Sequence, residues 1–234
     1  MKTVIVDNRI NELERNNLKK LDLNLIFAPT CNDISEAISS HPDEIICKVS
    51  DSLLIAYKNL PKEFISSLEC LNIKVLQSFN TFKKEYPYDV ALNGVVLKNF
   101  FIHNIKHTDP ILHNHISKKT IINVKQGYTK CSTAVISDSA IITSDIGIAR
   151  ASSAFNLDVL LLPPGDILLP GFDYGFIGGT CGLIGKNLLA FYGSLEKYKF
   201  KNKVLNFLNK HNITPIYLSN EKLVDRGSII CINH

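Results

Sequence analysis

Several common signatures are absent from the sequence, and each absence narrows the class of protein. None of the six cysteines forms a Cys-x-x-Cys pair, so zinc knuckles and thioredoxin-type redox motifs are excluded. No uninterrupted apolar run approaches the roughly 20 residues that a membrane-spanning helix needs. Lysine and arginine are spread among aspartate and glutamate, so the net charge of +4 does not indicate a nucleic-acid surface.

The sequence also has no signal peptide and no glycine-rich nucleotide-binding motif. The apolar stretch after Met1 and Lys2 is soon interrupted by Asp7 and is too short for a signal peptide. No P-loop or paired dinucleotide fingerprint occurs, so no cofactor is expected. We therefore expect a cytoplasmic protein that binds neither nucleic acid nor membrane and keeps its cysteines as free thiols.

The composition is typical of a soluble globular protein with a sizeable core. Of the 234 residues, 45% are hydrophobic and 21% are charged. We expect a single domain over residues 1–234, because one repeating pattern extends over most of the chain.

Four segments of the chain resemble one another, and each has the pattern of a β-hairpin. In each, an apolar strand, a two-residue polar turn and a second apolar strand follow one another. The four segments are CKVSDSLLIAY, GVVLKNFFIHN, TAVISDSAIITS and CGLIGKNLLAFY. Aligning their turns places Asp51, Lys98, Asp138 and Lys186 in register, at intervals of about 40 to 50 residues.

Each hairpin is followed by a helix start signal and a further apolar strand. The signals are Asn59-Leu60-Pro61, Asp109-Pro110, Asp145 as a helix cap, and Ser194 with Glu196. The repeating unit is therefore strand–strand–helix–strand. The four units cover approximately residues 41–78, 87–126, 127–166 and 171–220.

A fifth unit is incomplete at each end of the chain but whole when residues 225–234 are joined to residues 1–29. GSIICIN supplies its first strand, and TVIVD, a helix near residues 10–20 and NLIFAP supply the rest. That helix is expected to bury one face. The apolar residues of that face are Ile10, Leu13, Leu18 and Leu21.

A ring closed by the two termini has no free sheet edge, which removes a known liability of β-structure. The sequence therefore predicts an α/β fold, a five-bladed α/β propeller of repeated ββαβ units. The alternative is an open α/β sheet of ordinary βαβ units, but such sheets rarely need repeated hairpins.

A strand–strand–helix–strand unit repeated five times resembles the pentein fold of guanidino-group-modifying enzymes. That family includes arginine deiminases, dimethylarginine dimethylaminohydrolases, agmatine deiminases and amidinotransferases. The stretches GYTKCSTAVISDSAIITSDIGIARA and LLPGFDYGFIGGTCGLIGKNLLAFYGSL are also similar to a group of uncharacterised bacterial proteins assigned to this fold.

The resemblance implies a cysteine thiolate that attacks an amidine carbon, a histidine acid/base and carboxylates that hold the cationic guanidinium. DRGSIICINH is similar to the family's terminal Gly-x-x-Cys strand, which assigns the nucleophile to Cys231. The same comparison places Phe176 at the histidine position. It places Lys130-Cys131-Ser132 where the family has an acidic Glu-Gly-Gly motif.

The glycine-dense stretch from Asp166 to Phe191 supplies a second candidate nucleophile. Gly178, Gly179 and Gly182 surround Cys181 and would leave its thiol accessible. Backbone N–H groups of this segment, that of Thr180 included, could bind an anion. Alternatively, these glycines only let strands crowd together at the propeller axis. Cys131 occupies a comparable place before the preceding hairpin and is the third candidate nucleophile.

Carboxylates near this stretch are candidates for binding a cation. Asp173 lies between Phe172 and Tyr174, where aromatic rings and a carboxylate could clamp a positive charge. Asp225 could face the same axis from the final hairpin or simply form a turn.

The sequence predicts no metal site. His107, His113 and His115 form the one histidine cluster, but the i,i+2 spacing of the last two does not bring both imidazoles to one helix face. No third ligand is evident nearby.

Three hypotheses about function remain open. The first is a cysteine-dependent hydrolase or transferase acting on a small amidine or guanidine, with Cys231, Cys181 or Cys131 as nucleophile. The second is a diverged, non-catalytic propeller that binds a small polar molecule in the same axial pocket. The third is an interaction module, including a homo-oligomer, whose glycine-rich stretch lies at an interface.

Overall fold

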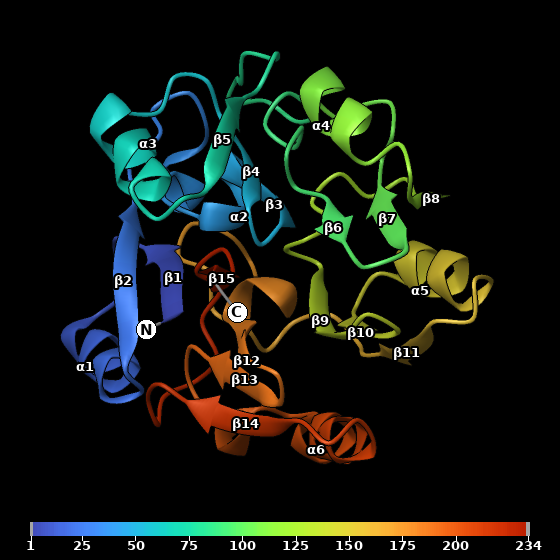
Figure 1. The fold of residues 1–234 in the computed structure, drawn as a ribbon. Helices are drawn as coiled ribbons and strands as arrows, with labels where there is room; N and C mark the ends of the chain where they lie inside the picture. The colour runs from blue at the N-terminus through green and yellow to red at the C-terminus, as the bar shows by residue number, and fades with distance from the viewer. Residues whose placement is uncertain (1, 233–234) are drawn as a thin grey trace.

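The computed structural model describes residues 2–232, which form five three-stranded sheets arranged around one axis (Figure 1). In every sheet the inner strand is antiparallel to the middle strand, and the middle strand is parallel to the outer one. From inner to outer strand, the sheets are β3 (Ile46–Ser50), β4 (Leu53–Ala56) and β5 (Lys74–Gln77); β6 (Val95–Val96), β7 (Phe100–His103) and β8 (Thr120–Asn123); β9 (Thr133–Ser137), β10 (Ala140–Thr143) and β11 (Asp158–Leu161); β12 (Cys181–Gly185), β13 (Leu188–Phe191) and β14 (Thr214–Tyr217); and β15 (Ile230–Ile232), β1 (Lys2–Asp7) and β2 (Leu23–Ala28). The predicted five-bladed α/β propeller is confirmed.

Each blade carries one α-helix between its middle and outer strands, on the outside of the ring (Figure 1). These helices are α1 (Glu12–Lys20), α3 (Lys62–Glu69), α4 (Pro110–His115), α5 (Ile146–Ser153) and α6 (Lys201–Lys210). The remaining helical segments are the short α2 (Pro42–Ile45) and the 3₁₀ turns η1 (Glu36–Ile38), η2 (Gly178–Thr180) and η3 (Leu195–Lys197). Among the described residues, no helix has the length and apolar character that crossing a membrane requires.

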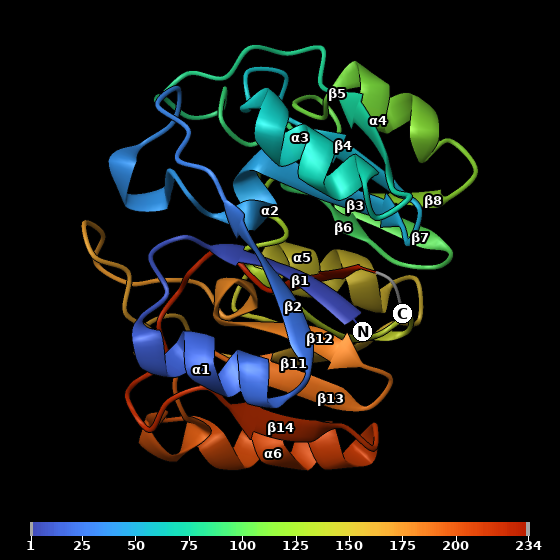
Figure 2. The same ribbon diagram turned by 60° about the vertical axis from the view of Figure 1, so that its left-hand side comes forward.

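The last blade joins the two ends of the chain, as the sequence predicts. Strand β15 pairs antiparallel with β1, with Val4 opposite Cys231, and β1 pairs in parallel with β2. The inner strand of this blade is therefore held by residues more than 200 positions away in the sequence. Figure 2 shows β1 and β2 lying between the upper and lower blades in that view.

Side-chain caps explain where several helices begin. The carboxylate of Asp145 accepts a hydrogen bond from the Ile148 N–H at 2.8 Å, and Asp109 accepts one from Ile111 at 2.9 Å, as predicted. The prediction for Ser194 is wrong in part. Ser194 caps the η3 turn through the Glu196 N–H, whereas α6 begins only at Lys201.

The expected apolar face of α1 also differs from the structure. Leu18 is buried, but Leu13 is 53% exposed, and the buried residue one turn before Leu18 is Glu14. Glu14 is tolerated there because its carboxylate accepts the N–H of Asn11 in a capping box and pairs with Arg226 at 3.2 Å.

The middle strands form most of the interior because each blade packs against a neighbour on both sides. Most of their residues are apolar, with aliphatic or aromatic side chains, which suits strands buried on both faces. Their fully or almost fully buried apolar residues are Leu54, Ile55, Ala56, Phe101, Ile102, Ala140, Ile141, Ile142, Leu189, Ala190, Phe191, Val4, Ile5 and Val6.

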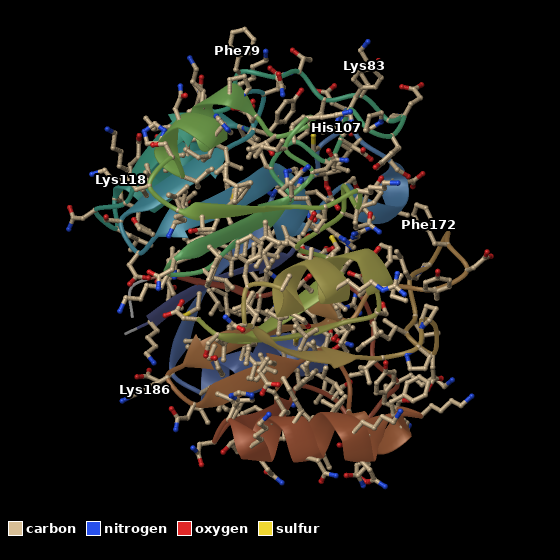
Figure 3. The ribbon with its side chains drawn as sticks, turned by 90° about the vertical axis from the view of Figure 1, so that its right-hand side faces the viewer. Phe79, Lys83, His107, Lys118, Phe172 and Lys186 are labelled. Carbon is tan, nitrogen blue, oxygen red and sulfur yellow. The ribbon has the colours of Figure 1, made fainter. Side chains whose placement is uncertain are left out.

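The two ends of the axis are built from different segments. The hairpin turns that follow the inner strands lie at one end, and the loops that precede these strands lie at the other. In Figure 3 Lys186, in the turn between β12 and β13, lies at the left edge of the molecule, and Phe172 projects at the right edge.

Candidate functional site

The segments just before the inner strands meet near the axis and supply the candidate site. Each blade contributes one such segment. They contain His41 with helix α2, Asn93, Cys131, the η2 turn and Asp225. Because the five blades converge there, residues far apart in the sequence become neighbours.

An acidic cluster surrounds the thiol of Cys131. Its Sγ lies 3.3 Å from Asp43 Oδ1 and 3.2 Å from Glu44 Oε1, so the thiol can donate to either carboxylate. Asn93 holds the cysteine in place: its Nδ2 donates to the sulfur at 3.1 Å and its Oδ1 accepts the Cys131 N–H at 3.2 Å. Asn93 Nδ2 also donates to the Asp43 carbonyl, which fixes the thiol relative to the start of α2.

The cluster is almost completely shielded from solvent. Glu44 is 0% exposed and Cys131 is 3% exposed, and Glu44 Oε2 has no hydrogen-bond partner among the described residues. Burial, followed by the charges of Asp43 and Asp89, raises the pKa of Glu44 well above its ordinary value. Burial, followed by the charges of Asp43 and Glu44, does the same to the pKa of Cys131. Burial and the neighbouring negative charges therefore both disfavour the charged forms of Glu44 and Cys131.

The second oxygen of Asp43 is held from the opposite side. The Ser228 hydroxyl lies 2.5 Å from Asp43 Oδ2, and Lys130 Nζ donates to the Ser228 oxygen at 2.7 Å. Ser228 has φ +68°, a conformation that non-glycine residues rarely adopt. A chain of contacts thus runs from Lys130 through Ser228 and Asp43 to Cys131.

His41 and Asp225 lie beside this cluster. His41 Nδ1 is 3.7 Å from Asp225 Oδ1 and has no hydrogen-bond partner among the described residues, while its Nε2 is 3.8 Å from Asp7 Oδ2. Asp225 accepts the N–H groups of Phe176 at 2.8 Å and Gly227 at 3.1 Å. Burial raises the pKa of Asp225, and the nearby His41 opposes this shift.

These groups open into a pocket of 240 Å³ at the end of the axis where Phe172 projects (Figure 3). The volume is below the roughly 300–1,000 Å³ of sites for drug-sized ligands, so the pocket suits a small molecule. Its lining residues are Ile38, His41, Glu44, Tyr128, Cys131, Leu169, Phe172, Asp173, Tyr174, Phe176 and Asp225. We call it the acidic pocket.

A wider channel of 550 Å³ occupies the other end of the axis and is lined by the inner strands of all five blades. We call it the lysine channel, after Lys48, Lys98, Lys119 and Lys130 in its wall. Asp43 lines the channel, whereas the next residue, Glu44, lines the acidic pocket. The Asp43 and Cys131 contacts therefore form the partition between the two cavities.

The structure separates the three candidate nucleophiles. Cys131 lines the acidic pocket, whereas Cys181 and Cys231 line the lysine channel. Burial raises the pKa of Cys181 to about 12, and it also raises the pKa of Cys231. Among the three, Cys131 is the one whose sulfur lies within hydrogen-bonding distance of carboxylates of the described residues.

Three of the predicted ligand-binding residues line the acidic pocket: Asp173, Tyr174 and Asp225. The other three, Gly178, Gly179 and Thr180, form the buried η2 turn. The N–H of Gly179 donates to the Cys131 carbonyl at 3.1 Å and that of Thr180 to the Ile177 carbonyl at 3.2 Å, so neither N–H is free to bind an anion.

The glycines of η2 instead allow close packing at the axis, the alternative that the sequence left open. A Cβ atom on Gly178 would lie 2.3 Å from the Lys130 carbonyl oxygen, and one on Gly179 would lie 1.8 Å from Asp225 Oδ1. The side chain of Cys181 is also less accessible than expected, since the residue is 1% exposed and its Sγ lies 3.6 Å from the Ile177 carbonyl.

Sequence reasoning missed the residues that contribute most charge to the site. The resemblance places Phe176 where a histidine would lie, yet the pocket contains His41, contributed by another blade. Likewise, the carboxylates near Cys131 come from Asp43 and Glu44. A signal was present: the polar segment SHPDE directly precedes the first repeated hairpin, as Cys131 precedes the third.

The same cluster contains the atoms that a metal ion would need. Ligand atoms of Asp43, Glu44 and Cys131 lie within 4.8 Å of one another. The sequence predicts no metal site, and this juxtaposition arises only from folding. Two carboxylates and a thiol suit a divalent ion of intermediate softness, but they also suit an organic cation with several N–H donors.

Comparison with solved structures identifies the fold as pentein-like. The amidinotransferase SxtG of saxitoxin biosynthesis from Microseira wollei is 10% identical, with a TM-score of 0.54 over 94% of this chain and 88% of that chain. A mutant dimethylarginine dimethylaminohydrolase from Pseudomonas aeruginosa, complexed with citrulline, is 9% identical, with a TM-score of 0.55 over 93% and 92%. A mutant agmatine deiminase from C. jejuni with substrate bound is 10% identical, with a TM-score of 0.51 over 98% and 81%.

At these identities the similarity shows the shared fold. No curated protein matches the sequence. A family model does match it over residues 5–230, nearly the whole chain, and its description is Family of unknown function (DUF6873). The chain is therefore a member of the DUF6873 family with the pentein-like α/β-propeller fold.

Proposed function

We propose that the acidic pocket binds a small amidine or guanidine cation and that Cys131 is the nucleophile of a hydrolase or transferase reaction on it. One observation carries the proposal: the buried Glu44 carboxylate, with Oε2 unpartnered among the described residues, lies next to the Cys131 thiol in the wall of a small pocket. A buried carboxylate of this kind gains most from a cation that brings both charge and N–H donors.

A planar amidinium matches the arrangement of acceptors. Its N–H groups can donate to Glu44, and Asp225 offers a second carboxylate in the same lining. Hydrogen bonds between charged groups are worth roughly 1.5–3 kcal/mol each, more than neutral ones. Aromatic rings of Tyr128 and Phe176, whose centroids are 6.4 Å apart, form part of the wall.

The proposed reaction follows from the contacts of Cys131. The sulfur attacks the amidine carbon while the thiol proton passes to the carboxylate of Glu44 or Asp43. The C–N bond to the leaving amine then breaks, and that amine departs with a proton. His41 is a candidate to supply this proton because it lines the same pocket. Water, or a second amine, attacks the S-amidino adduct and restores the thiol.

A bound cation would also lower the raised pKa of the Cys131 thiol. Burial and the charges of Asp43 and Glu44 keep Cys131 as a thiol. A positive charge held by those carboxylates stabilises the thiolate, so the substrate itself would activate the nucleophile.

A second candidate function is binding without turnover, for the same class of cation. The observation that favours it is that Asn93 Nδ2 and two carboxylate oxygens already surround the Cys131 sulfur. A thiol held this way can be a structural part of a binding site.

Butylguanidine is a suitable first probe because it carries the cationic head without other functional groups. We expect it to raise the melting temperature of the wild-type protein, and we expect this rise to be lost in Glu44→Gln. Intact-mass spectrometry should then detect an amidino adduct on the protein, and release of butylamine or ammonia should be measurable. The adduct should be absent from Cys131→Ser and present in Cys181→Ser.

The outcomes separate the two candidates. Binding without an adduct or amine release supports the non-catalytic function, whereas an unchanged melting temperature contradicts both. Adding EDTA, and titrating Zn²⁺ or Mn²⁺ in place of butylguanidine, tests a metal as the occupant. Stabilisation by the metal alone would contradict an organic cation.

A further inference from the structure

We infer that the lysine channel is a second ligand site and that it takes a small organic monoanion with an apolar body, such as a short-chain carboxylate. This site is separate from the acidic pocket, and the inference goes beyond the proposed function without depending on it. The size, the net charge and the wall of the channel each point to this class of ligand.

The channel is large enough for such a molecule. Its volume of 550 Å³ lies within the roughly 300–1,000 Å³ of small-molecule sites. All five inner strands, β3, β6, β9, β12 and β15, contribute residues to its lining. Because these strands are paired within the sheets of the propeller, the cavity is already formed in the folded chain.

The charges of the lining leave one positive charge in excess. Four lysines and three aspartates line the channel, and no arginine, histidine or glutamate is among its described residues. Asp51 pairs with Lys48 at 2.7 Å. Asp43 accepts the Ser228 hydroxyl, to which Lys130 donates at 2.7 Å. The lining therefore suits a ligand with one negative charge, since a second would have no matching cation.

The excess charge lies at Lys98 and Lys119. Lys119 Nζ donates to the carbonyls of Leu97 at 2.7 Å and Lys98 at 3.0 Å, which are neutral acceptors. Asp138, the third aspartate, accepts the backbone N–H of Lys98 at 2.8 Å, whereas Lys98 Nζ has no partner among the described residues. An ammonium group has three N–H donors, so both lysines keep donors for a ligand.

Apolar side chains form the wall beside these two lysines. Val96, Val135 and Leu183 come from three different inner strands, and each is half-buried in the channel lining. Val96 directly precedes Leu97, whose carbonyl accepts Lys119. An apolar ligand body would cover this surface, and inorganic phosphate would leave it in water. The combination therefore favours an organic anion.

Hexanoate is a suitable probe, and its affinity can be measured by titration in two-dimensional ¹H–¹⁵N NMR spectra. Hexan-1-ol has the same apolar chain without the charge, and inorganic phosphate has charge without the chain. We expect hexanoate to bind about fivefold more tightly than either, and its affinity to fall as sodium chloride is added.

Lys119→Gln should weaken hexanoate binding about fivefold and leave hexan-1-ol unchanged. Lys118→Gln is the matched control, because Lys118 is exposed, lies outside the lining and is seen at the outer edge of the molecule in Figure 3. It should bind hexanoate like wild type.

Lys119 also holds the turn between β6 and β7 through its two carbonyl contacts, so a second variant is needed. Lys98→Gln keeps those contacts and removes the ammonium group that has no partner among the described residues. We expect it to weaken hexanoate binding about threefold.

The opposite results would each overturn the inference. Equal affinities for hexanoate and hexan-1-ol would show that the lysines do not recognise the anion, and tighter binding of phosphate would remove the apolar body. Competition by butylguanidine would place hexanoate in the acidic pocket. If Lys98→Gln and Lys119→Gln both bind like Lys118→Gln, or if hexanoate does not bind at all, the channel is not an anion site. None of these results bears on the proposed function, which butylguanidine tests separately.

Discussion

The two cavities on the propeller axis lie at opposite ends of the five inner strands, and they differ in charge and in size. The acidic pocket is small and aromatic, and its lining has three carboxylates and no lysine or arginine. The lysine channel is more than twice as large, and its lining has four lysines beside three aspartates. Residues adjacent in sequence line different cavities: Asp43 and Lys130 line the channel, whereas Glu44 and Cys131 line the pocket.

The comparison shows that the residues lining each cavity depend on which end of the inner strands they lie at. The five-bladed fold alone does not determine their charge. Residues before the inner strands come from loops and can be charged without disturbing the sheets. In the channel, several lysines are committed to the scaffold: Lys48 donates to the Cys231 carbonyl at 2.7 Å, and Lys119 to the Leu97 carbonyl at 2.7 Å. Amidine chemistry is therefore expected at the acidic end.

The largest expected effect comes from overpacking the axis at the η2 turn. Gly178→Ala places a methyl group within about 2.3–2.4 Å of two carbonyl oxygens, those of Lys130 and Thr133. Backbone atoms cannot easily move aside, so we expect unfolding free energy to fall by about 3 kcal/mol or more in urea denaturation. Gly185→Ala is the control, because its new methyl group approaches only flexible side-chain atoms and should be nearly neutral. A Gly178→Ala protein as stable as wild type would contradict the packing described.

The alkylation rates of the cysteines provide a second comparison. Cys70 is exposed and should be alkylated more than a hundredfold faster at pH 8 than Cys131 or Cys181, whose pKa values are raised by burial. Peptide mapping by mass spectrometry gives the individual rates. Asp43→Asn should accelerate Cys131 about threefold, because the Asp43 charge raises the pKa of that thiol. Equal acceleration of Cys181 would show that the variant loosens the whole axis instead.

Ligand binding provides a third comparison. Glu44→Gln keeps the shape of the side chain but removes its negative charge, so butylguanidine affinity should fall at least tenfold. Lys98→Gln alters the channel without touching the pocket and should bind the cation like wild type. Calorimetry measures both. A loss of affinity in Lys98→Gln as large as in Glu44→Gln would place the cation in the channel.

The smallest expected effect is on the pH dependence of stability. The folded-state pKa values of Glu44 and Asp225 are raised, so the folded protein binds more protons than the unfolded chain, and stability falls as pH rises from about 4 through those values. Glu44→Gln should therefore show a shallower decline than wild type between pH 5 and 8 in denaturant titrations. Parallel profiles would mean that Glu44 does not titrate differently in the two states.

The repeated hairpins could be predicted because their signals are local. Alternation of apolar strands and polar turns places Asp51, Lys98, Asp138 and Lys186 in register, and each lies between the first two strands of its blade. Closure by the termini could also be predicted, since an isolated strand at each end requires a partner. The helix caps at Asp109 and Asp145 depend on residues two or three positions away, and they too were accessible.

The candidate site could be predicted only in part. Cys131, Asp173, Tyr174 and Asp225 stand out in the sequence beside glycines and aromatic residues, and all four line the acidic pocket. Resemblance alone favours Cys231, which the structure places in the other cavity.

The sequence by itself therefore determined the repeating unit, the number of blades and the way the ring closes, because each depends on hydrophobic alternation and short-range turn chemistry. Only the tertiary structure decided which side chains share the pocket. Glu44 and Cys131 are separated by 87 positions, and Ser228 and Asp43 by 185. Convergence of the five inner strands brings them within hydrogen-bonding distance. The shifted pKa values follow from that convergence, since burial and neighbouring charge exist only in the folded chain.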